Sequence, residues 1–311
     1  MDIRPIGLST ALFTLGICIL WGGNVVAIKF GLIAFPPFWS AFWRFLICCI
    51  VVFLWSHWRG LSLLPQRSEI RQLGILGCLF TVQIASLNLG VNWTSPAYGV
   101  VLLNANPIFA NLLAHFVVPG DRLSVRRVIA LLMAFGGICI VFLGNPVETL
   151  AERPMMGNLL VILTSFLLGI RVVYTNRLVQ SIEPVRAVFW QAMGSLPVFL
   201  LCGWLFEPPL LSSFVPLASL LAVAYQGVIV AGFCFVGWTI LLKHHSPSKL
   251  SMFGFVSPIF GVLFSGLFFG EPITSRLWIG LIAVTLGIFL VTRQGSSPSN
   301  PATGLVKEDA Q

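Results

Sequence analysis

Charged side chains are scarce in this 311-residue sequence, at 9% of the residues, whereas an ordinary soluble domain has about 25%. Apolar residues make up 57% of the chain, and the mean hydropathy is +0.96. No soluble fold needs that much apolar surface. The composition therefore excludes an ordinary soluble protein and indicates a chain that lies within a membrane.

The sequence also lacks the motifs of enzymes and of ATP-driven pumps. It contains no P-loop, no glycine-rich dinucleotide fingerprint and no recognisable nucleophile motif. Every Asp and Glu falls in a polar segment, at the end of an apolar run or in the C-terminal tail, so a membrane enzyme would have no catalytic acid or base at mid-membrane. We therefore expect no enzymatic activity, no cofactor and no ATP-driven transport by this chain alone.

Cysteine content and net charge exclude two further kinds of site. All seven cysteines lie inside apolar runs, where cysteine behaves as a small hydrophobic residue, so we predict neither disulfides nor a metal site. The formal net charge is +8, but there is no soluble domain to present a basic face. Because loop Lys and Arg are explained by membrane topology, we expect no binding to nucleic acid.

Apolar runs of about twenty residues, separated by short polar segments, have the length needed to cross roughly 30 Å of hydrocarbon. A membrane β-barrel would instead show alternating segments of about ten residues. The sequence therefore predicts an all-α, polytopic membrane protein. Its ten predicted spans cover residues 10–34, 38–57, 71–92, 96–118, 124–144, 157–179, 186–206, 215–242, 248–269 and 275–293.

Basic residues between the spans and near the span ends fall mainly on one side of this topology. With the amino terminus inside, only Arg153 and Arg276 lie in outer segments. Thirteen basic residues lie in inner segments: Arg4, Arg59, Arg67, Arg71, Arg122, Arg126, Arg127, Arg177, Arg186, Lys243, Lys249, Arg293 and Lys307. The positive-inside rule then predicts that the N-terminus at 1–9 and the tail at 294–311 are cytoplasmic. The polar composition of the tail predicts that it is disordered. We expect the protein in a bacterial-type inner (plasma) membrane.

The second half of the sequence repeats the first at an offset of roughly 150 residues. The aligned segments are Phe42-Trp43-Arg44 with Phe189-Trp190-Gln191, Pro37 with Pro184, and Asn106-Pro107-Ile108-Phe109 with Ser257-Pro258-Ile259-Phe260. Because five spans is an odd number, the two copies must cross the membrane in opposite senses, as in many secondary transporters. We predict a first repeat at 10–144, an extracytoplasmic linker at 145–156 and a second repeat at 157–293.

The order of these motifs resembles a known family. The matching features are Trp21-Gly22 through Lys29, then Pro37 and Trp43-Arg44-Phe45, and an acidic turn in each half at Gly120-Asp121 and Gly270-Glu271. They are similar to those of the EamA-type members of the drug/metabolite transporter superfamily. This resemblance covers nearly the whole chain except the tail. It implies ten helices in two inverted five-helix repeats and transport of small metabolites such as amino acids.

Pro107 and Pro258 lie near the midpoints of the fourth and ninth spans, at equivalent positions of the two repeats. Each proline removes a backbone hydrogen bond and frees the carbonyl four residues earlier, at Leu103 or Gly254, which then needs a partner deep in the membrane. We predict that both prolines act as hinges in bent helices that line a central cavity. A simple kink accommodated by neighbouring helices is the alternative.

Polar and aromatic residues supply further candidates for a solute site. Asn104, Asn111 and His115 share one face of the fourth span, and a polar stripe of this kind should face protein or water rather than lipid. Hydrogen bonding between helices is the alternative role. Trp43 and Trp190 occupy equivalent positions in the repeats, where they could flank the cavity as a symmetric pair or serve only in packing.

Three cations, Lys29, Arg44 and Arg171, lie within spans that hold no Asp or Glu at mid-membrane. A central charge in a bilayer costs at least about 3 kcal/mol, so something must compensate. Backbone carbonyls, helix C-termini or extension to the headgroups could do so, the last chiefly for Lys29. Arg44 is suited to bidentate capture of a carboxylate. We therefore predict that these cations bind a solute with a negative or zwitterionic group.

Together these features predict a membrane transporter whose partners are the lipid bilayer and a small polar solute. An amino acid or a related carboxylate-bearing metabolite is favoured, moved by alternating access in an exporter or a facilitator. A channel or a structural membrane subunit is the alternative, and a membrane enzyme is the least favoured. A carrier would show saturation and counterflow, whereas a channel would not saturate.

Overall fold

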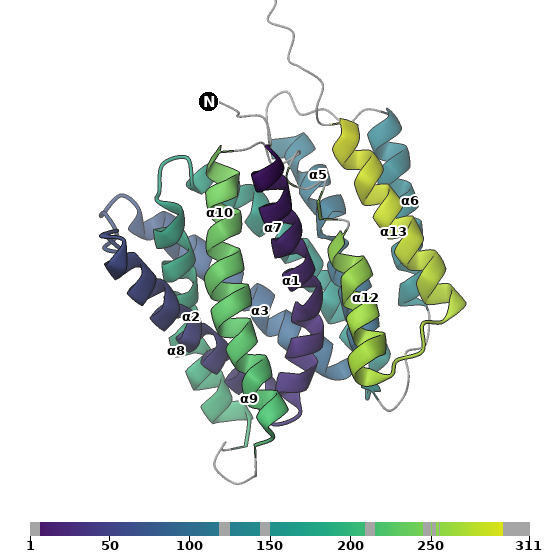
Figure 1. The fold of residues 1–311 in the computed structure, drawn as a ribbon, viewed down its shortest axis with the longest axis horizontal. Coiled ribbons are helices and arrows are strands. Elements are labelled where there is room, and N and C mark those ends of the chain that lie inside the picture. The colour runs from purple at the N-terminus through teal and green to yellow at the C-terminus, as the bar shows by residue number, and fades with distance from the viewer. Residues whose placement is uncertain are drawn as a thin grey trace, which may run out of the picture.

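The structure, a computed structural model, describes residues 7–117, 125–143, 150–208, 215–244, 250, 253–254 and 256–294. Within these ranges the chain is helical and contains no strand (Figure 1). The helices are α1 (Leu8–Leu32), α2 (Pro37–Trp58), α3 (Ile70–Trp93), α4 (Pro96–Leu103), α5 (Asn106–Val117), α6 (Val125–Phe142), α7 (Pro154–Leu178), α8 (Pro184–Phe206), α9 (Leu217–Ala224), the π-helix η3 (Tyr225–Cys234), α10 (Phe235–His244), α12 (Val256–Phe269) and α13 (Ser275–Gln294).

These helices form ten membrane-crossing segments over the described residues, because α4 continues into α5 and α9 continues through η3 into α10. Six segments are individually long and apolar enough to span a bilayer, and shorter apolar helices lie within α6, α12 and α13. Proline occupies the first turn of α2, α4, α7 and α8, where its missing N–H would have no partner inside the helix. The predicted all-α, polytopic fold is confirmed.

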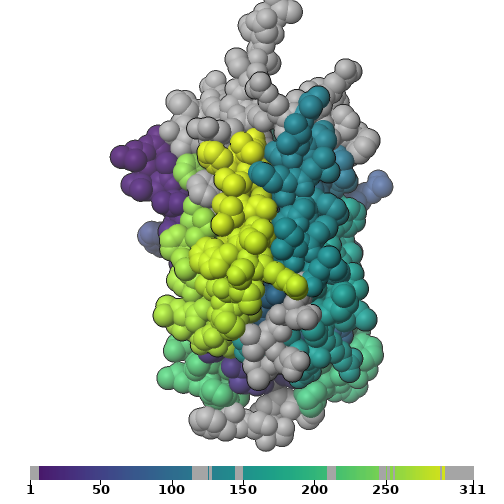
Figure 2. Space-filling model, turned by 90° about the vertical axis from the view of Figure 1, so that its right-hand side faces the viewer, coloured from purple at the N-terminus to yellow at the C-terminus, as the bar shows by residue number. Residues whose placement is uncertain are grey.

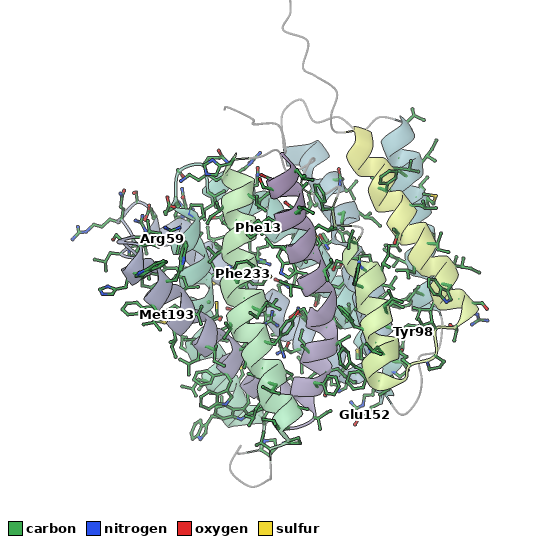
Figure 3. All side chains as sticks on the ribbon, in the orientation of Figure 1. Phe13, Arg59, Tyr98, Glu152, Met193 and Phe233 are labelled. Atoms are coloured by element: carbon green, nitrogen blue, oxygen red, sulfur yellow. The ribbon has the colours of Figure 1, made fainter. Side chains whose placement is uncertain are left out.

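The bundle has two ends, which we name after one exposed residue at each. Arg59 follows α2 at one end, and Glu152 precedes α7 at the opposite end (Figure 3). The Arg59 end also contains the starts of α1, α3 and α8, whereas the Glu152 end contains the starts of α2, α4 and α7. Successive segments from α1 to the α4–α5 segment therefore alternate in direction through the bundle, as do α7 and α8.

The two halves of the chain pack against each other helix by helix. The main pairs are α6 with α13, α3 with α7, α2 with α8, α1 with α12 and α5 with α7, and each pair joins the first half to the second. Figure 2 shows α13, in yellow, lying along α6, in teal. The repeat relates the α1–α12 pair to the α7–α5 pair, and in each pair the first helix of one repeat packs on a helix of the other. This is the arrangement expected of two inverted repeats.

Buried glutamates cap helix starts at the Glu152 end. The carboxylate of Glu271 accepts hydrogen bonds from the Ala97 backbone N–H at 3.0 Å and the Ser265 hydroxyl at 2.6 Å, and also from the Ser95 hydroxyl. Ser95 and Ala97 belong to the start of α4. A negative charge is favourable beside the unpaired N–H groups at a helix N-terminus. The predicted acidic turn at Gly270-Glu271 thus anchors α4.

Candidate functional site

The fourth span is interrupted where the sequence predicts a bend. α4 ends at Leu103 and α5 begins at Asn106. The Leu103 carbonyl, which Pro107 deprives of its usual partner, accepts hydrogen bonds from the Ser165 hydroxyl at 2.6 Å and the Asn106 amide at 3.1 Å. The prediction that this carbonyl needs a polar partner is therefore confirmed, and α7 supplies one through Ser165.

The ninth span contains an equivalent interruption. α12 begins at Val256, after a turn at residues 253–254, so Pro258 lies in its first turn. The Gly254 carbonyl accepts a hydrogen bond from the Ser257 backbone N–H at 3.2 Å. Proline is well tolerated at a helix start. Both prolines therefore mark the start of a half-helix rather than a bend in a continuous helix.

Two equivalent glycines hold these half-helices in place. A Cβ atom at Gly22 of α1 would lie 2.8 Å from the Ser257 carbonyl oxygen, and one at Gly169 of α7 would lie 3.2 Å from the Asn106 carbonyl oxygen. Gly22 and Gly169 occupy the same position in the two repeats, and so do Asn106 and Ser257. Each half-helix start thus packs closely on the first helix of the opposite repeat, where a side chain would not fit.

Arg44 lies in the interior of α2 and is 1% exposed. Its Nη1 atom is 3.5 Å from Oε1 of Gln226, which belongs to η3, and its Nε atom is buried with no hydrogen-bond partner among the described residues. The guanidinium carbon lies 4.9 Å from the ring centroid of Phe45. Gln226 is itself fixed by a 2.9 Å hydrogen bond from its amide to the Ala27 carbonyl.

Arg171 occupies a similar environment in α7. Its Nη1 atom donates a hydrogen bond to Oε1 of Gln191 in α8 at 3.1 Å. Its guanidinium carbon lies 5.2 Å from the ring centroid of Phe80 and 5.7 Å from that of Phe235. The Nε atom is again buried without a partner in the described part of the chain. Over the described residues, amides and aromatic rings are thus the groups that hold the two cations.

Arg44 and Arg171 are related through the repeat. Position 44 corresponds to Gln191, and position 171 corresponds to Asn24, so each repeat contributes one arginine and one amide. The Oδ1 atom of Asn24 is buried and has no partner among the described residues. We refer to Asn24, Arg44, Arg171, Gln191 and Gln226 as the arginine cluster.

The arginine cluster contains no acidic residue. Salt bridges among the described residues join Arg186 to Glu69 at 2.8 Å and Lys243 to Glu183 at 3.0 Å. All four residues lie at or beyond helix termini at the Arg59 end. The two guanidinium groups lie over Phe45 and Phe80, whose ring centroids are 4.8 Å apart. The cluster therefore has an excess of positive charge that none of the described carboxylates neutralises through a salt bridge.

Lys29, the third predicted solute-binding cation, has a different environment. Its Nζ atom donates hydrogen bonds to the carbonyls of Val91 at 3.1 Å, Asn92 at 3.1 Å and Thr94 at 2.8 Å. These three bonds use all the N–H groups of the ammonium. Lys29 therefore neutralises the carbonyl end of α3, where a cation is favourable, and we leave it out of the site.

The two equivalent tryptophans lie away from the arginine cluster. Trp43 is 38% exposed on the outer surface of the bundle and packs edge-to-face on Phe42. Trp190 donates a hydrogen bond from Nε1 to the Leu63 carbonyl at 2.7 Å. Neither ring is among those that contact Arg44 or Arg171. The predicted pair does not flank these cations, and we leave it out of the site too.

The predicted polar stripe of the fourth span is bonded within its own helix. The Asn104 amide donates to the Val100 carbonyl at 2.8 Å, and the Asn111 amide donates to the Pro107 carbonyl at 2.8 Å. The side chain of His115 lies outside the described residues. Both asparagines stabilise the backbone around the helix break, and neither contacts the arginine cluster through a hydrogen bond.

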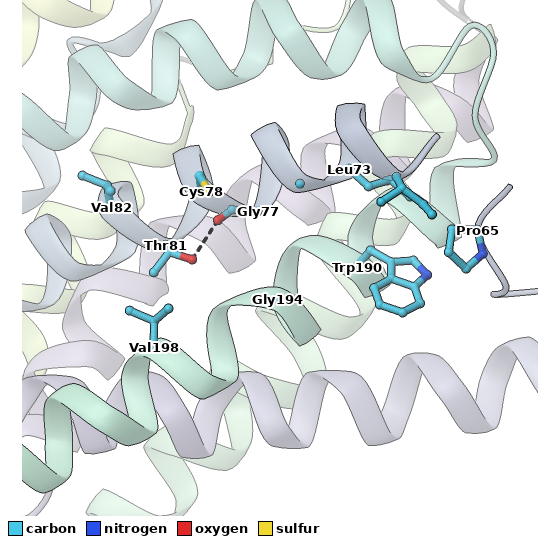
Figure 4. Close-up of a pocket in the computed structure, with 11 residues that line it drawn as sticks. Pro65, Leu73, Gly77, Cys78, Thr81, Val82, Trp190, Gly194 and Val198 are labelled. Carbon is cyan, nitrogen blue, oxygen red and sulfur yellow. Dashed lines mark hydrogen bonds between the residues drawn. The ribbon is translucent and has the colours of Figure 1, made fainter. Parts of the chain in front are cut away.

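Figure 4 shows a groove between α3 and α8, and none of its lining residues belongs to the arginine cluster. It has a volume of about 610 Å³, and its walls are almost entirely apolar. Trp190 and Gly194 form part of one wall, and Gly77, Cys78 and Thr81 form part of the other. No charged residue lines the groove.

Sequence reasoning missed the role of Gln226 and of the aromatic rings. Gln226 does not stand out among the polar residues of the sequence, but its Oε1 atom lies 3.5 Å from Nη1 of Arg44. Its helix, η3, is a π-helix, a form that often occurs at functional sites. Phe80 and Phe235 gave no signal in an apolar sequence, because phenylalanine is common in every span.

Comparison with known proteins agrees with this architecture. The sequence profile of the EamA-like transporter family matches residues 8–143 and again residues 155–293. The chain is 24% identical over 281 residues to "Uncharacterized transporter YoaV" of Bacillus subtilis, covering 89% of this chain and 94% of the relative. It is 22% identical over 302 residues to "Uncharacterized inner membrane transporter YedA" of Escherichia coli K12, covering 96% and 95%.

A solved crystal structure shares the fold. It superposes with a TM-score of 0.67 at 22% sequence identity and covers 94% of this chain and 100% of its own. The two family matches together span most of the described helices. The two relatives are named as transporters, and the similarity covers nearly their whole length. This chain therefore belongs to the EamA-like transporter family and is a multi-pass membrane transporter.

Proposed function

We propose that this chain is a carrier that moves a small carboxylate-bearing solute, such as an amino acid or an organic acid, by alternating access. The observation behind the proposal is the arginine cluster, where Arg44 and Arg171 have buried Nε atoms and no salt bridge within the described residues. We expect the protein to act as an exporter or a facilitator in the inner membrane.

The energetics of the membrane interior support this assignment. A charged side chain near the bilayer centre costs at least about 3 kcal/mol, so two unneutralised arginines are expensive to keep unless they serve a ligand. The amides of Gln191 and Gln226 offer dipoles but no charge. A solute carboxylate would supply both the missing charge and acceptors for the free edge of a guanidinium.

The interrupted helices supply plausible moving parts. Each half-helix start packs on the first helix of the opposite repeat through Gly22 or Gly169. Discontinuous helices that meet near the midplane of inverted repeats are typical of carriers in which one repeat rocks against the other. Pro107 and Pro258 stay predicted hinges. Replacing either by alanine is expected to lower the turnover rate more than it lowers expression.

Transport by purified protein in proteoliposomes tests the proposed solute class. We expect the native protein to transport a carboxylate-bearing solute in preference to its neutral amide, and Arg44→Gln to lose that preference. Arg67→Gln, in an exposed loop at the Arg59 end, is the matched control and should behave as the native protein. An equal rate for acid and amide in the native protein would exclude a carboxylate-binding site.

Counterflow separates a carrier from a channel. Preloading the vesicles with unlabelled solute should accelerate uptake of the labelled solute, because a carrier returns faster when it is occupied. Flux that rises linearly with concentration and shows no counterflow would exclude the alternating-access mechanism.

We also propose that the Arg59 end and both termini are cytoplasmic, because basic residues are concentrated in the segments assigned to that side. A fluorescent protein fused after Gln311 is expected to fluoresce, and alkaline phosphatase fused at the same point should be inactive. The reverse pattern would invert the topology.

A further inference from the structure

The arginine cluster has two anion-binding edges. Arg44 and Arg171 each place Nη1 near a glutamine oxygen, at Gln226 and Gln191 respectively. In each guanidinium the edge formed by Nε and Nη2 has no hydrogen-bond partner among the described residues. This edge can bind a carboxylate through two parallel N–H···O bonds. Each arginine can therefore take a carboxylate of its own.

The two edges lie at separate points of the bundle. The guanidinium of Arg44 lies over Phe45 and that of Arg171 lies over Phe80, and the two ring centroids are 4.8 Å apart. Arg44 is seven residues from the start of α2 at the Glu152 end (37 to 44), and Arg171 is seven residues from the end of α7 at the Arg59 end (171 to 178). Arg44 thus lies nearer the Glu152 end of the bundle, and Arg171 lies nearer the Arg59 end.

We infer that the solute is a short dicarboxylate and that each of its carboxylates binds one arginine of the cluster. This inference rests on the proposed function and narrows it. A monocarboxylate would neutralise only one of the two neighbouring cations and leave a net positive charge in the membrane interior, whereas a dicarboxylate would neutralise both. Charge balance therefore favours a solute with two anionic groups.

The groups between the arginines suit the spacer of such a solute. The ring of Phe80 lies between those of Phe45 and Phe235, at centroid distances of 4.8 Å and 6.4 Å. These rings provide apolar surface and no acceptor that would compete for the guanidinium groups. The two cations with apolar rings between them match a short hydrocarbon chain with a carboxylate at each end.

Thermal unfolding of the purified full-length protein in detergent measures binding directly, since a ligand of the folded state raises the midpoint. The probes are malonate, succinate and glutarate, each with its monoamide and its diamide. We expect at least one diacid to raise the midpoint at a concentration about ten-fold below that needed for its monoamide, because the monoamide loses one charge-assisted contact. The diamide should have no effect.

Two variants locate the second charge. Arg171→Gln should bind the diacid and its monoamide equally, because a single arginine remains. The double variant N24R/R171N moves the arginine from position 171 to position 24, its equivalent in the first repeat. The variant still has two arginines, now both in the first repeat, so it controls for total charge. It should also lose the preference for the diacid, because the two binding edges no longer lie nearer opposite ends of the bundle.

The outcomes distinguish this inference from the proposed function. If every diacid binds no better than its monoamide while the diamides fail to bind, the dicarboxylate inference is overturned and the carboxylate carrier stands. If the diamides bind as well as the acids, the proposed function itself fails. Retention of the diacid preference by Arg171→Gln, or no midpoint shift with any of the three diacids, would also overturn the inference.

Discussion

Charged residues at the ends of the bundle and at its centre have opposite environments. At the Arg59 end, Arg186 pairs with Glu69 and Lys243 pairs with Glu183. At the centre, Arg44 and Arg171 have amide and aromatic neighbours and no salt bridge within the described residues. The paired charges hold helices together, whereas the central charges lack the partner that a structural role would require. A charged residue that forms a salt bridge is therefore assigned a structural role, whereas a buried cation without one is a candidate for binding a solute.

The largest expected effect comes from removing a central charge. Arg171→Gln should lower carboxylate transport by about 100-fold, the equivalent of two hydrogen bonds to a charged group. The unfolding midpoint should stay unchanged or rise, because an uncompensated charge leaves the membrane interior. Transport assays and thermal unfolding on the same preparation measure both. A lower midpoint with transport retained would assign Arg171 to the structural group.

Glu271→Ala should produce the largest loss of stability among the end residues. It removes the acceptor for the Ala97 N–H and the hydroxyls of Ser95 and Ser265. We expect a loss of about 2–3 kcal/mol, because these donors would remain buried without partners. The exposed Glu152→Ala is the control at the same end and should leave the midpoint unchanged. Equal midpoints for the two variants would contradict the capping role.

Lys29→Met should have a smaller effect on stability and none on solute choice. The carbonyls of Val91, Asn92 and Thr94 would lose a shared cation at the end of α3, which costs about 1 kcal/mol. The ratio of acid to amide transport should equal that of the native protein, in contrast to Arg44→Gln. A changed ratio would return Lys29 to the solute site.

The smallest expected effect is a pH dependence at Glu207, which follows α8 at the Glu152 end. Burial raises the pKa of this carboxyl, although hydrogen bonds from the backbone N–H groups of Phe38 and Trp39 oppose the shift. The folded state therefore binds the proton more tightly than the unfolded state. This contribution to stability is present below about pH 4, the usual glutamate value, and is lost as the pH rises through the folded pKa.

Comparing unfolding midpoints of the native protein and Glu207→Gln at several pH values measures this contribution. As the pH falls from neutral, the unfolding midpoint of the native protein should rise relative to that of Glu207→Gln. A shift in the opposite direction would mean that the hydrogen bonds from Phe38 and Trp39 outweigh burial.

Features that depend on local backbone chemistry could be predicted from the sequence. Pro107 lacks an N–H group in any fold, so the need for a partner at the Leu103 carbonyl follows from the residue type alone. An arginine within an apolar run, as at positions 44 and 171, is equally visible without a structure. The interruption of the helix and the central cations could therefore be located in advance.

Features that depend on which helices meet could not be predicted in this way. Lys29 finds its three carbonyls on α3, more than sixty residues along the chain, and only the packing of α1 against α3 brings them within reach. Trp43 and Gln226 both lie in apolar helices whose hydrophobic residues surround the axis. Periodicity therefore could not tell which of them faces the interior.

The placement of the two arginines has a consequence for directionality. In a carrier whose repeats were identical, the inward-open and outward-open forms would be related by a two-fold axis in the membrane plane and would have equal energies. Here the repeat relates Arg44 to Gln191 and Arg171 to Asn24, so exchanging the roles of the repeats exchanges a cation for a neutral amide at each position. An empty carrier of the proposed kind is therefore expected to have a preferred resting orientation, because its two repeats differ in charge at these positions.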